Sequence, residues 1–273
     1  MRLTKLKNVP LAIKLIGHIK FPNDFIRRHG IYDRWFLKHK KDTKQVNLKY
    51  PVSHSNVPVF VISFNRLSYV KQMVEFLEKY GFKNIHIVDN QSSYEPLLEY
   101  LRHSSHHVHF MDKNYGHRVV WESGFFDNII SKEPYIVTDP DIQPNENLPH
   151  DFYHILYQTL ISHPYITKVG FALDIFNLPD NEQSMQVKKW ESKFWEDKLS
   201  DDSDKYWADI DTTFGLYRPG KNLWRFYDAI RIGGNFTARH LPWHEQEESA
   251  EKKFYADTAS ASASWIKNTE MYE

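Results

Sequence analysis

Two aspartates one residue apart form the strongest chemical feature of the sequence. Asp139 and Asp141 flank Pro140 and directly follow the apolar run Tyr135–Thr138. In an extended chain, side chains two positions apart point to the same side, so both carboxylates can face one ion. Pro140 fixes its own backbone and favours an extended Asp139, which makes this geometry rigid. The pair predicts a Mg²⁺ or Mn²⁺ site that is completed by phosphate oxygens, and the alternative is a solvated acidic turn.

Strands that alternate with helices must position these carboxylates. Runs rich in β-branched residues predict buried strands, and apolar residues at helical spacing predict the helices between them. The strands are expected over 58–64, 84–90, 107–111 and 135–138, and the helices over 68–80, 95–102 and 118–130. This order is typical of an α/β fold with a mostly parallel sheet, which binds its ligands at the carboxyl ends of the strands.

Polar side chains follow each of the first three strands. They are Ser63, Asn65 and Arg66 after the first, Asp89 and Asn90 after the second, and Asn114, His117 and Arg118 after the third. The first two groups could hydrogen-bond a ribose or a base. The third precedes a helix, where helix N–H groups and a cation can meet a diphosphate. Each loop alone is compatible with ordinary turn chemistry.

These motifs resemble the nucleotide-binding half of a GT-A glycosyltransferase, with the family 2 group of bacterial polysaccharide-assembly enzymes as the best match. The matching segments are 60–66, 87–92, 114–116 and 139–141. The resemblance implies a Rossmann-like GT-A fold, a UDP-sugar donor with Asp89 near its nucleoside, and Mn²⁺ or Mg²⁺ between Asp139, Asp141 and the diphosphate. The third loop departs from the glycine-rich stretch of many relatives.

The resemblance also assigns roles in the second half of the chain. Inverting members of the group use a carboxylate there to take the proton of the acceptor hydroxyl, and Asp211 is the first candidate, with Asp209 in reserve. A cap or loop function is the alternative for both residues. A histidine near the C-terminus often completes the metal site in GT-A enzymes, which makes His240 a candidate ligand ahead of His244.

Charge is distributed unevenly, although the net charge of the 273 residues is zero. Residues 1–50 carry thirteen Lys or Arg against three Asp, a net of +10, so the remaining residues carry −10. The same segment interleaves aromatic and basic residues, which is typical of amphipathic helices at an anionic membrane surface; an arm packed on the main domain is the alternative. We therefore expect a basic helical N-terminal extension over 1–50 and a GT-A domain over 51–273, divided into a donor half, 57–142, and an acceptor half, 143–273.

Composition restricts the compartment and the chemistry. The chain has no Cys, which excludes disulfides and thiol catalysis, and it has no apolar run long enough to cross a bilayer. A cytoplasmic protein, peripheral on the inner membrane face, fits these features. Nucleic-acid binding is not expected, because the body is acidic and no base-reading motif appears.

The sequence thus predicts a metal-dependent hexosyltransferase. It would move a sugar from a nucleotide-sugar to a glycan or lipid-linked glycan, with inversion, in the assembly of lipopolysaccharide or capsule. Two alternatives remain at this point. One is a sugar-phosphate nucleotidyltransferase, although Ser63–Arg66 lacks the glycines expected after its first strand. The other is a catalytically inactive, transferase-like scaffold at the membrane.

Overall fold

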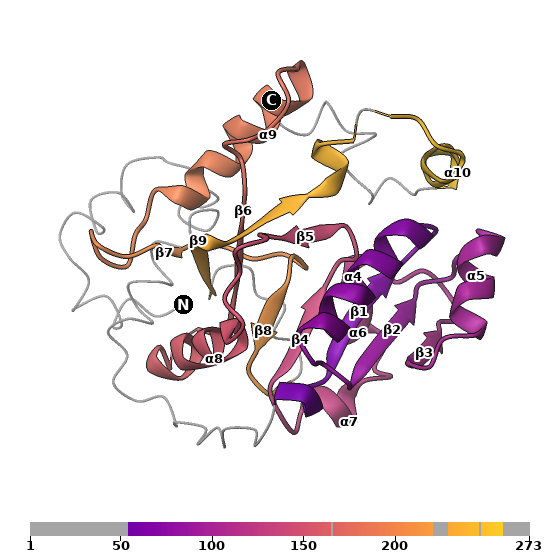
Figure 1. The fold of residues 1–273 in the computed structure, drawn as a ribbon. Coiled ribbons are helices and arrows are strands. Elements are labelled where there is room, and N and C mark those ends of the chain that lie inside the picture. The colour runs from indigo at the N-terminus through magenta and orange to yellow at the C-terminus, as the bar shows by residue number, and fades with distance from the viewer. Residues whose placement is uncertain (1–53, 165, 221–228, 246, 259–273) are drawn as a thin grey trace, which may run out of the picture.

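The computed structural model describes residues 54–164, 166–220, 229–245 and 247–258. They form a mixed α/β fold in which helices flank one sheet, and nine strands of that sheet lie within the described ranges (Figure 1). The predicted basic extension, residues 1–50, lies outside the described residues. No helix in the described part of the chain combines the length and the apolar character that a bilayer-spanning segment needs.

The elements alternate in the first half and become more irregular in the second. The strands are β1 (Val59–Ser63), β2 (Ile85–Asp89), β3 (His107–Phe110), β4 (Tyr135–Thr138), β5 (Ile142–Pro144), β6 (Lys168–Leu173), β7 (Lys205–Trp207), β8 (Gly215–Tyr217) and β9 (Ala229–His240). The α-helices are α4 (Leu67–Lys79), α5 (Glu95–Arg102), α6 (Val119–Glu122), α7 (Asp127–Ile130), α8 (Phe152–Ser162), α9 (Glu182–Glu191) and α10 (Ala250–Thr258). The 3-10 turns are η2 (His54–Asn56), η3 (Gly116–Arg118), η4 (Ser192–Trp195) and η5 (Leu241–Trp243).

Four strands form the parallel part of the sheet, in the order β3-β2-β1-β4. Each of the strands predicted from the sequence is present, with ends that differ by at most one residue. Parallel strands end at one edge of a sheet, so the loops after β1, β2 and β4 meet there. The parallel arrangement predicted for this half is confirmed.

Antiparallel pairs dominate the second half of the sheet. Strand β8 lies between β4 and β6 and is antiparallel to both, whereas β6 and β9 are parallel. The β6–β9 register jumps after Phe171, which pairs with Ile232, to Ala172, which pairs with Thr237. The residues of β9 between these pairs include Gly234, whose φ of +58° suits glycine. Beyond this bulge, β9 turns to pair with β5 and brings His240 opposite Ile142.

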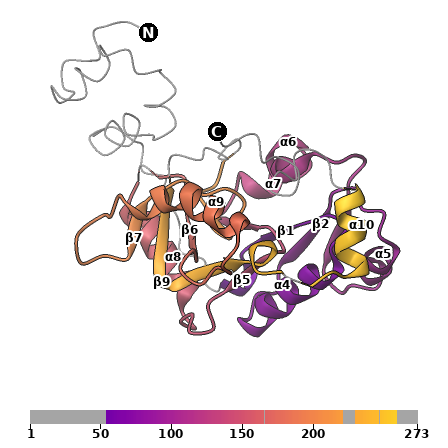
Figure 2. The same cartoon turned by 90° about the horizontal axis from the view of Figure 1, so that it is seen from above.

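The two faces of the parallel strands bury different cores, because alternate residues of a strand point to opposite faces. Val59 and Val61 of β1 pack with α4, α5 and α8 in the larger cluster. Phe60 and Ile62 pack with α6 and α7 in the smaller one. Figure 2 shows α4 on one side of the sheet and α6 and α7 on the other. With both faces covered, the edge formed by the strand ends remains as the place for a ligand.

One predicted helix is wrong. The helix expected over 118–130 is broken into η3, α6 and α7. Gly124 lies between α6 and α7 with φ of +72°, a conformation that no right-handed helix contains. The break leaves Phe125 64% exposed while Phe126 is buried in the smaller core. Apolar spacing alone therefore overestimated the helix, because the glycine ends it.

Candidate functional site

The edge at the carboxyl ends of β1, β2 and β4 carries an unusual number of buried polar side chains. They are Ser63, Asn65, Arg66, Asp89 and Asn90, each 5% exposed or less. Burying such groups is unfavourable unless they find hydrogen-bond or charge partners. Their partners therefore show which of them shape the edge and which have bonding capacity left for a ligand.

Asp139 is held at the end of β4 by the loop that precedes β8. Its backbone N–H donates to the Thr212 carbonyl at 2.7 Å, and the Thr212 hydroxyl donates to Asp139 Oδ2 at 2.5 Å. Asp141 is held from the other direction by the end of β9. Its backbone carbonyl accepts from Leu241 N at 2.9 Å, and its Oδ2 lies 3.4 Å from His240 Nε2. Two distant segments thus fix the carboxylates that flank Pro140.

The electrostatic environment of the two carboxyls differs. Burial raises the pKa of Asp139 well above its usual value, and the charges of Asp141 and Asp211 raise it further, against the hydrogen bond from Thr212. Burial also acts to raise the pKa of Asp141, but His240 and Arg66 outweigh it and lower that pKa. The three aspartates therefore lie within electrostatic reach of one another, an arrangement that a cation would stabilise.

The pair has free capacity for such a cation. Asp141 Oδ1 is buried without a hydrogen-bond partner, and so is His240 Nδ1. However, His240 faces Asp141 through its Nε2, and the described ranges contain no group of three or more His, Asp or Glu side chains arranged to hold a metal. The predicted set of Asp139, Asp141 and His240 is thus brought together but is not a preformed three-ligand cage. Two carboxylates with phosphate oxygens suit Mg²⁺, which rarely takes an all-protein cage.

Asn65 and Asn90, both predicted to bind the nucleotide, use their amides to hold loops. Asn65 has φ of +51°, and its Oδ1 accepts from the backbone N–H groups of Ser93 and Tyr94 at 2.7 and 3.0 Å. Asn90 Nδ2 donates to the Gly116 carbonyl at 2.9 Å, and its Oδ1 accepts from Tyr115 N at 2.8 Å. These contacts join the loops after β1, β2 and β3 into one structure.

Asp89 and Ser63 keep bonding capacity for a ligand. The two residues are paired in the β1–β2 register. Asp89 Oδ2 accepts from Ser92 N at 3.2 Å, whereas Asp89 Oδ1 and the Ser63 hydroxyl are buried without hydrogen-bond partners. Burial raises the pKa of Asp89. An unsatisfied carboxylate oxygen beside a hydroxyl could accept the hydrogen bonds of a ribose or a base.

The third loop makes contacts within itself. Asn114 Oδ1 accepts from Gly116 N at 2.8 Å, and Gly116 has φ of +68°. Arg118 Nε lies 3.2 Å from His117 Nε2, and Arg118 Nη1 forms an ion pair with Glu122 at 3.4 Å. The Arg118 side chain is 35% exposed. Asn114 and Arg118, two of the predicted diphosphate ligands, are therefore more exposed than Arg66, whose side chain is 6% exposed.

Two buried cations hold the loop that carries Asp209 and Asp211. Lys168 of β6 donates from Nζ to the Ile210 carbonyl, and Arg231 of β9 donates from Nε to the Asp209 carbonyl at 2.5 Å. Arg231 also forms a buried ion pair with Glu191 at 2.7 Å. The Asp211 side chain is exposed at the edge of the site, and its charge raises the pKa of Asp139. The loop thus presents Asp211 to solvent beside the carboxylate pair.

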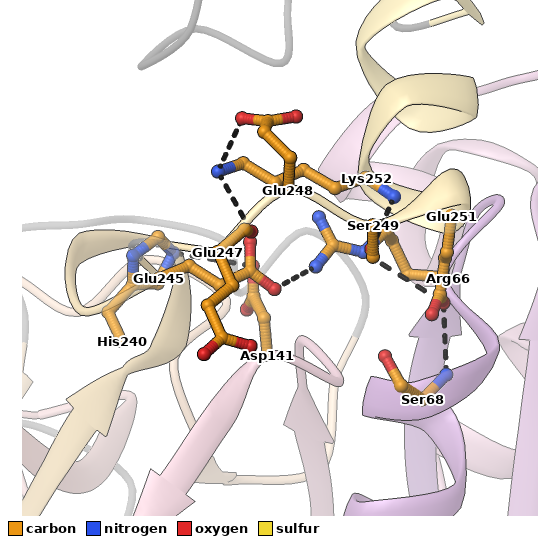
Figure 3. A network of polar contacts seen from close by, with 10 residues as sticks. All are labelled: Arg66, Ser68, Asp141, His240, Glu245, Glu247, Glu248, Ser249, Glu251 and Lys252. Carbon is orange, nitrogen blue, oxygen red and sulfur yellow. Dashed lines mark hydrogen bonds and ion pairs between the residues drawn. The ribbon is translucent and has the colours of Figure 1, made fainter.

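Arg66 is contacted by the C-terminal part of the chain. Its Nη2 forms an ion pair with Glu245 Oε1 at 2.7 Å, and its Nε lies 3.9 Å from Glu251 Oε1 (Figure 3). Its guanidinium also lies over the rings of Tyr69 and Tyr255, at 3.9 and 5.3 Å from their centroids. Cations over aromatic faces are stabilised by the ring quadrupole. Arg66 is therefore a buried cation whose acidic partners come from residues 245–251.

Helix α10 extends this contact along the edge. Ser68 N donates to Glu251 Oε1 at 2.9 Å, and Asn65 Nδ2 donates to the Thr258 hydroxyl at 2.9 Å. Burial and the charges of Asp141 and Asp139 raise the pKa of Tyr255 to about 12, despite Arg66. The helix thus lies beside the carboxylate pair.

Sequence reasoning missed Thr212, Glu245, Glu251 and Tyr255 as members of this region. Glu245 and Glu251 belong to an acidic stretch of the sequence, but their position beside Arg66 and Ser68 depends on contacts between distant segments.

No protein-family model matches this chain, and no curated protein matches its sequence. Among solved structures, its fold is similar to the mannosyltransferase PcManGT from Pyrobaculum calidifontis, which was solved in complex with GDP-Man and Mn²⁺. The TM-score is 0.44 at 10% sequence identity, over 84% of this chain and 68% of that chain. A likeness of this size describes a shared arrangement of elements and assigns no activity.

Proposed function

We propose that the chain is a divalent-cation-dependent glycosyltransferase that binds a nucleotide-sugar at the carboxyl edge of β1, β2 and β4. The observation that carries the proposal is the Asp139–Pro140–Asp141 turn, which ends a parallel strand and sets two mutually repelling carboxylates beside a buried arginine. Such an edge binds nucleotides in many α/β proteins, and paired carboxylates suit a cation that also takes phosphate oxygens.

The nucleoside is assigned to the first two loops. Asp89 Oδ1 and the Ser63 hydroxyl, both buried without hydrogen-bond partners, supply acceptor and donor groups for a ribose or base. Asn65 and Asn90 act on this ligand through the loops that they hold. This assignment is supported by the position of the pair at adjacent strand ends.

The diphosphate is assigned to Asp139, Asp141 and Arg66, with His117 and Arg118 of the third loop at the open side. A bound Mg²⁺ or Mn²⁺ would neutralise the diphosphate as it leaves, so that the bond to the sugar breaks without protonation. Arg66 adds a fixed positive charge there, since its field already lowers the pKa of Asp141. His240 remains a candidate third ligand.

The acceptor hydroxyl is assigned to Asp211, with Asp209 as the reserve. An exposed carboxylate next to the carboxylate pair can take the hydroxyl proton as the oxygen attacks the anomeric carbon. Attack from the face opposite the leaving diphosphate would invert that carbon. The donor sugar and base, the glycan or lipid-linked glycan acceptor, and a role of residues 1–50 at a membrane belong to this proposal as predictions from the sequence.

Thermal unfolding with a panel of UDP-, GDP- and CMP-sugars, each with and without Mn²⁺, tests the proposal. A ligand that binds the folded state at 100 times its Kd adds about 2.7 kcal/mol to the free energy of unfolding. We expect one donor class to raise the Tm only with Mn²⁺, and to release its nucleotide on incubation. A panel that stabilises nothing, or stabilisation that persists in a D139A/D141A variant, would contradict the proposal. Pyrophosphate release from UTP and a sugar phosphate would instead identify a nucleotidyltransferase.

A further inference from the structure

We propose that Arg66 and the N-terminus of α4 form a phosphate-binding site, which the protein fills with its own carboxylates, Glu245 and Glu251. A ligand with a diphosphate group must then displace the segment 245–258 to bind. The inference rests on the proposed function for the identity of that ligand, a nucleoside diphosphate or its sugar ester. We call residues 245–258 the C-terminal strap, and nothing is claimed for residue 246 within it.

The site has two neighbouring positions that attract anions. One is the Arg66 guanidinium, and the other is the Ser68 N–H in the first turn of α4, a helix of 13 residues without a side-chain cap. Helix N-termini attract anions through their free N–H groups and the helix dipole. Glu251 reaches both positions, because its Oε1 accepts from Ser68 N at 2.9 Å and lies 3.9 Å from Arg66 Nε. Glu245 Oε1 pairs with Arg66 Nη2 at 2.7 Å.

Arg66 provides the second observation that points to a ligand. Its side chain is only 6% exposed, yet its Nε is buried without a hydrogen-bond partner. Such a cation needs anionic partners, and those of the strap reach it from outside, since Glu245 and Glu251 are 27% and 14% exposed. Figure 3 shows both carboxylates entering from the strap, with Asp141 in the same network. Two carboxylates in adjacent positions occupy the place that two linked phosphates would need.

Few contacts other than the two carboxylates hold the C-terminal strap on the body of the protein. The residues of α10 are exposed or half-buried, with Phe254 and Tyr255 among the half-buried ones. Besides the two carboxylates, its contacts with the body include the Asn65–Thr258 hydrogen bond, the Tyr255 ring below the Arg66 guanidinium, and the ring contacts of Phe254 with Tyr94 and Tyr255 with Phe64. Elements with few buried apolar contacts open at low free energy. A diphosphate that pairs better with Arg66 can therefore replace the strap.

Competition of this kind weakens the apparent affinity for the anion. The apparent Kd is the intrinsic Kd divided by the fraction of molecules in which the strap has left the site. The E245Q/E251Q variant removes both competing charges with little change of shape. The matched control is E247Q/E248Q, which removes two charges from the same strap. Glu248 is 78% exposed and pairs with Lys252, and Glu247 is exposed. Calorimetric titration with inorganic pyrophosphate at constant Mg²⁺ gives the Kd of each protein.

We expect E245Q/E251Q to bind pyrophosphate roughly tenfold more tightly than the wild type, and E247Q/E248Q to bind within about twofold of it. Equal Kd values for E245Q/E251Q and the wild type, an equal gain in the control, or no binding by any of the three would overturn the inference. Hydrogen exchange of the wild-type amides over 250–258 is the second measurement, should E245Q/E251Q fail to fold. Faster exchange with pyrophosphate supports displacement, and unchanged or slower exchange contradicts it.

The two proposals can fail separately. If pyrophosphate competes with the strap but no nucleotide-sugar donates its sugar, the phosphate site is supported and the glycosyltransferase activity is contradicted. If sugar transfer is found while E245Q/E251Q has the wild-type Kd for pyrophosphate, the glycosyltransferase activity is supported. The strap is then a permanent part of the site that phosphate does not displace.

Discussion

Thr212 and Asp139 are joined at two points. The Thr212 hydroxyl donates to Asp139 Oδ2 at 2.5 Å, and the Asp139 N–H donates to the Thr212 carbonyl at 2.7 Å. The side-chain bond leaves the other carboxylate oxygen of Asp139 for a ligand. It also links the end of β4 to the loop that carries Asp211, so the proposed metal ligand and the proposed base share one support.

We expect the Thr212→Val variant to need roughly tenfold more Mn²⁺ for half-maximal activity. Val has nearly the same shape but cannot donate, and a hydrogen bond to a charged group contributes about 1.5–3 kcal/mol. The measurement is a Mn²⁺ titration of nucleotide release from the donor that the thermal screen identifies. Thr212→Ser keeps the hydroxyl and should restore the wild-type titration. If Ser behaves like Val, the hydroxyl does not orient Asp139.

The Asp141→Ala variant should lose at least roughly 10²-fold in transfer rate while it remains folded, because it removes a carboxylate from the diphosphate site. Rates are measured with saturating donor and Mn²⁺, and circular dichroism verifies the fold. The exposed Asp202, changed to Ala, is the control for loss of one negative charge. A wild-type rate for Asp141→Ala would contradict the assignment of Asp141 as a metal ligand.

The roles of Asp211 and Asp209 can be distinguished by changing each residue to Asn in turn. A general base contributes typically 10²–10⁴-fold to the rate, so Asp211→Asn should lower kcat by about that factor with little change in donor KM. Asp209→Asn should lose far less. Its backbone carbonyl, which Arg231 holds at 2.5 Å, is unchanged by the substitution. A larger loss of kcat in Asp209→Asn than in Asp211→Asn would identify Asp209 as the general base.

Arg231 and Glu191 form a buried pair, with side chains 4% and 6% exposed. Arg231→Met leaves a buried carboxylate without its partner, and we expect a loss of about 3–5 kcal/mol in the free energy of unfolding. Urea denaturation measures it. The double variant R231M/E191M removes both charges and should recover most of the loss. A double variant as unstable as the single one would show that the lost hydrogen bond to the Asp209 carbonyl dominates.

His86 predicts a pH dependence of stability. It stacks on His107 and His109, and its Nδ1 lies 2.9 Å from His109 Nε2. Burial, and then the neighbouring histidines, lower its pKa from 6.5 to about 4. At pH 7 the imidazole is neutral in the folded chain and mostly neutral in the unfolded one. Between pH 6.5 and 4 the unfolded chain binds a proton that the folded chain resists, so stability is lost as the pH falls through this window.

The loss due to His86 should approach about 3 kcal/mol at the acid end of the window. Denaturant unfolding of the wild type and of His86→Gln at a series of pH values measures it. The difference between the two proteins should change with pH below 6.5, in favour of the variant. Parallel stability curves down to pH 4 would show that His86 is protonated as easily in the folded chain.

The parallel half of the fold was predictable because its signals are local. Strands buried on both faces appear as continuous apolar runs, and α5 begins and ends at the residues expected, Glu95 and Arg102. The break at Gly124 is local too, but a single glycine does not reveal whether its φ is positive. The antiparallel insertion of β8 between β4 and β6 was not predictable, because strand order depends on pairing between distant segments.

The candidate site shows the same limit. Asp139 and Asp141 are close because only Pro140 separates them in the chain. Asn65 and Asn90 look like ligands for a nucleotide, yet their amides bind backbone groups of neighbouring loops. An amide side chain can serve either purpose, so the sequence did not reveal these loop contacts, and nucleotide binding by the two residues stays a prediction. Glu245 and Thr212 come from segments whose approach only the folded chain defines.

The hydrogen bond between Asn65 and Thr258 joins residues 193 positions apart. A ribosome makes the N-terminal half of the sheet first, so β1 and β4, which end at Ser63 and Thr138, can pair long before residues 245–258 exist. During that interval Arg66 has no glutamate beside it. The phosphate site proposed at Arg66 is therefore open in the nascent chain until Glu245 and Glu251 have been made.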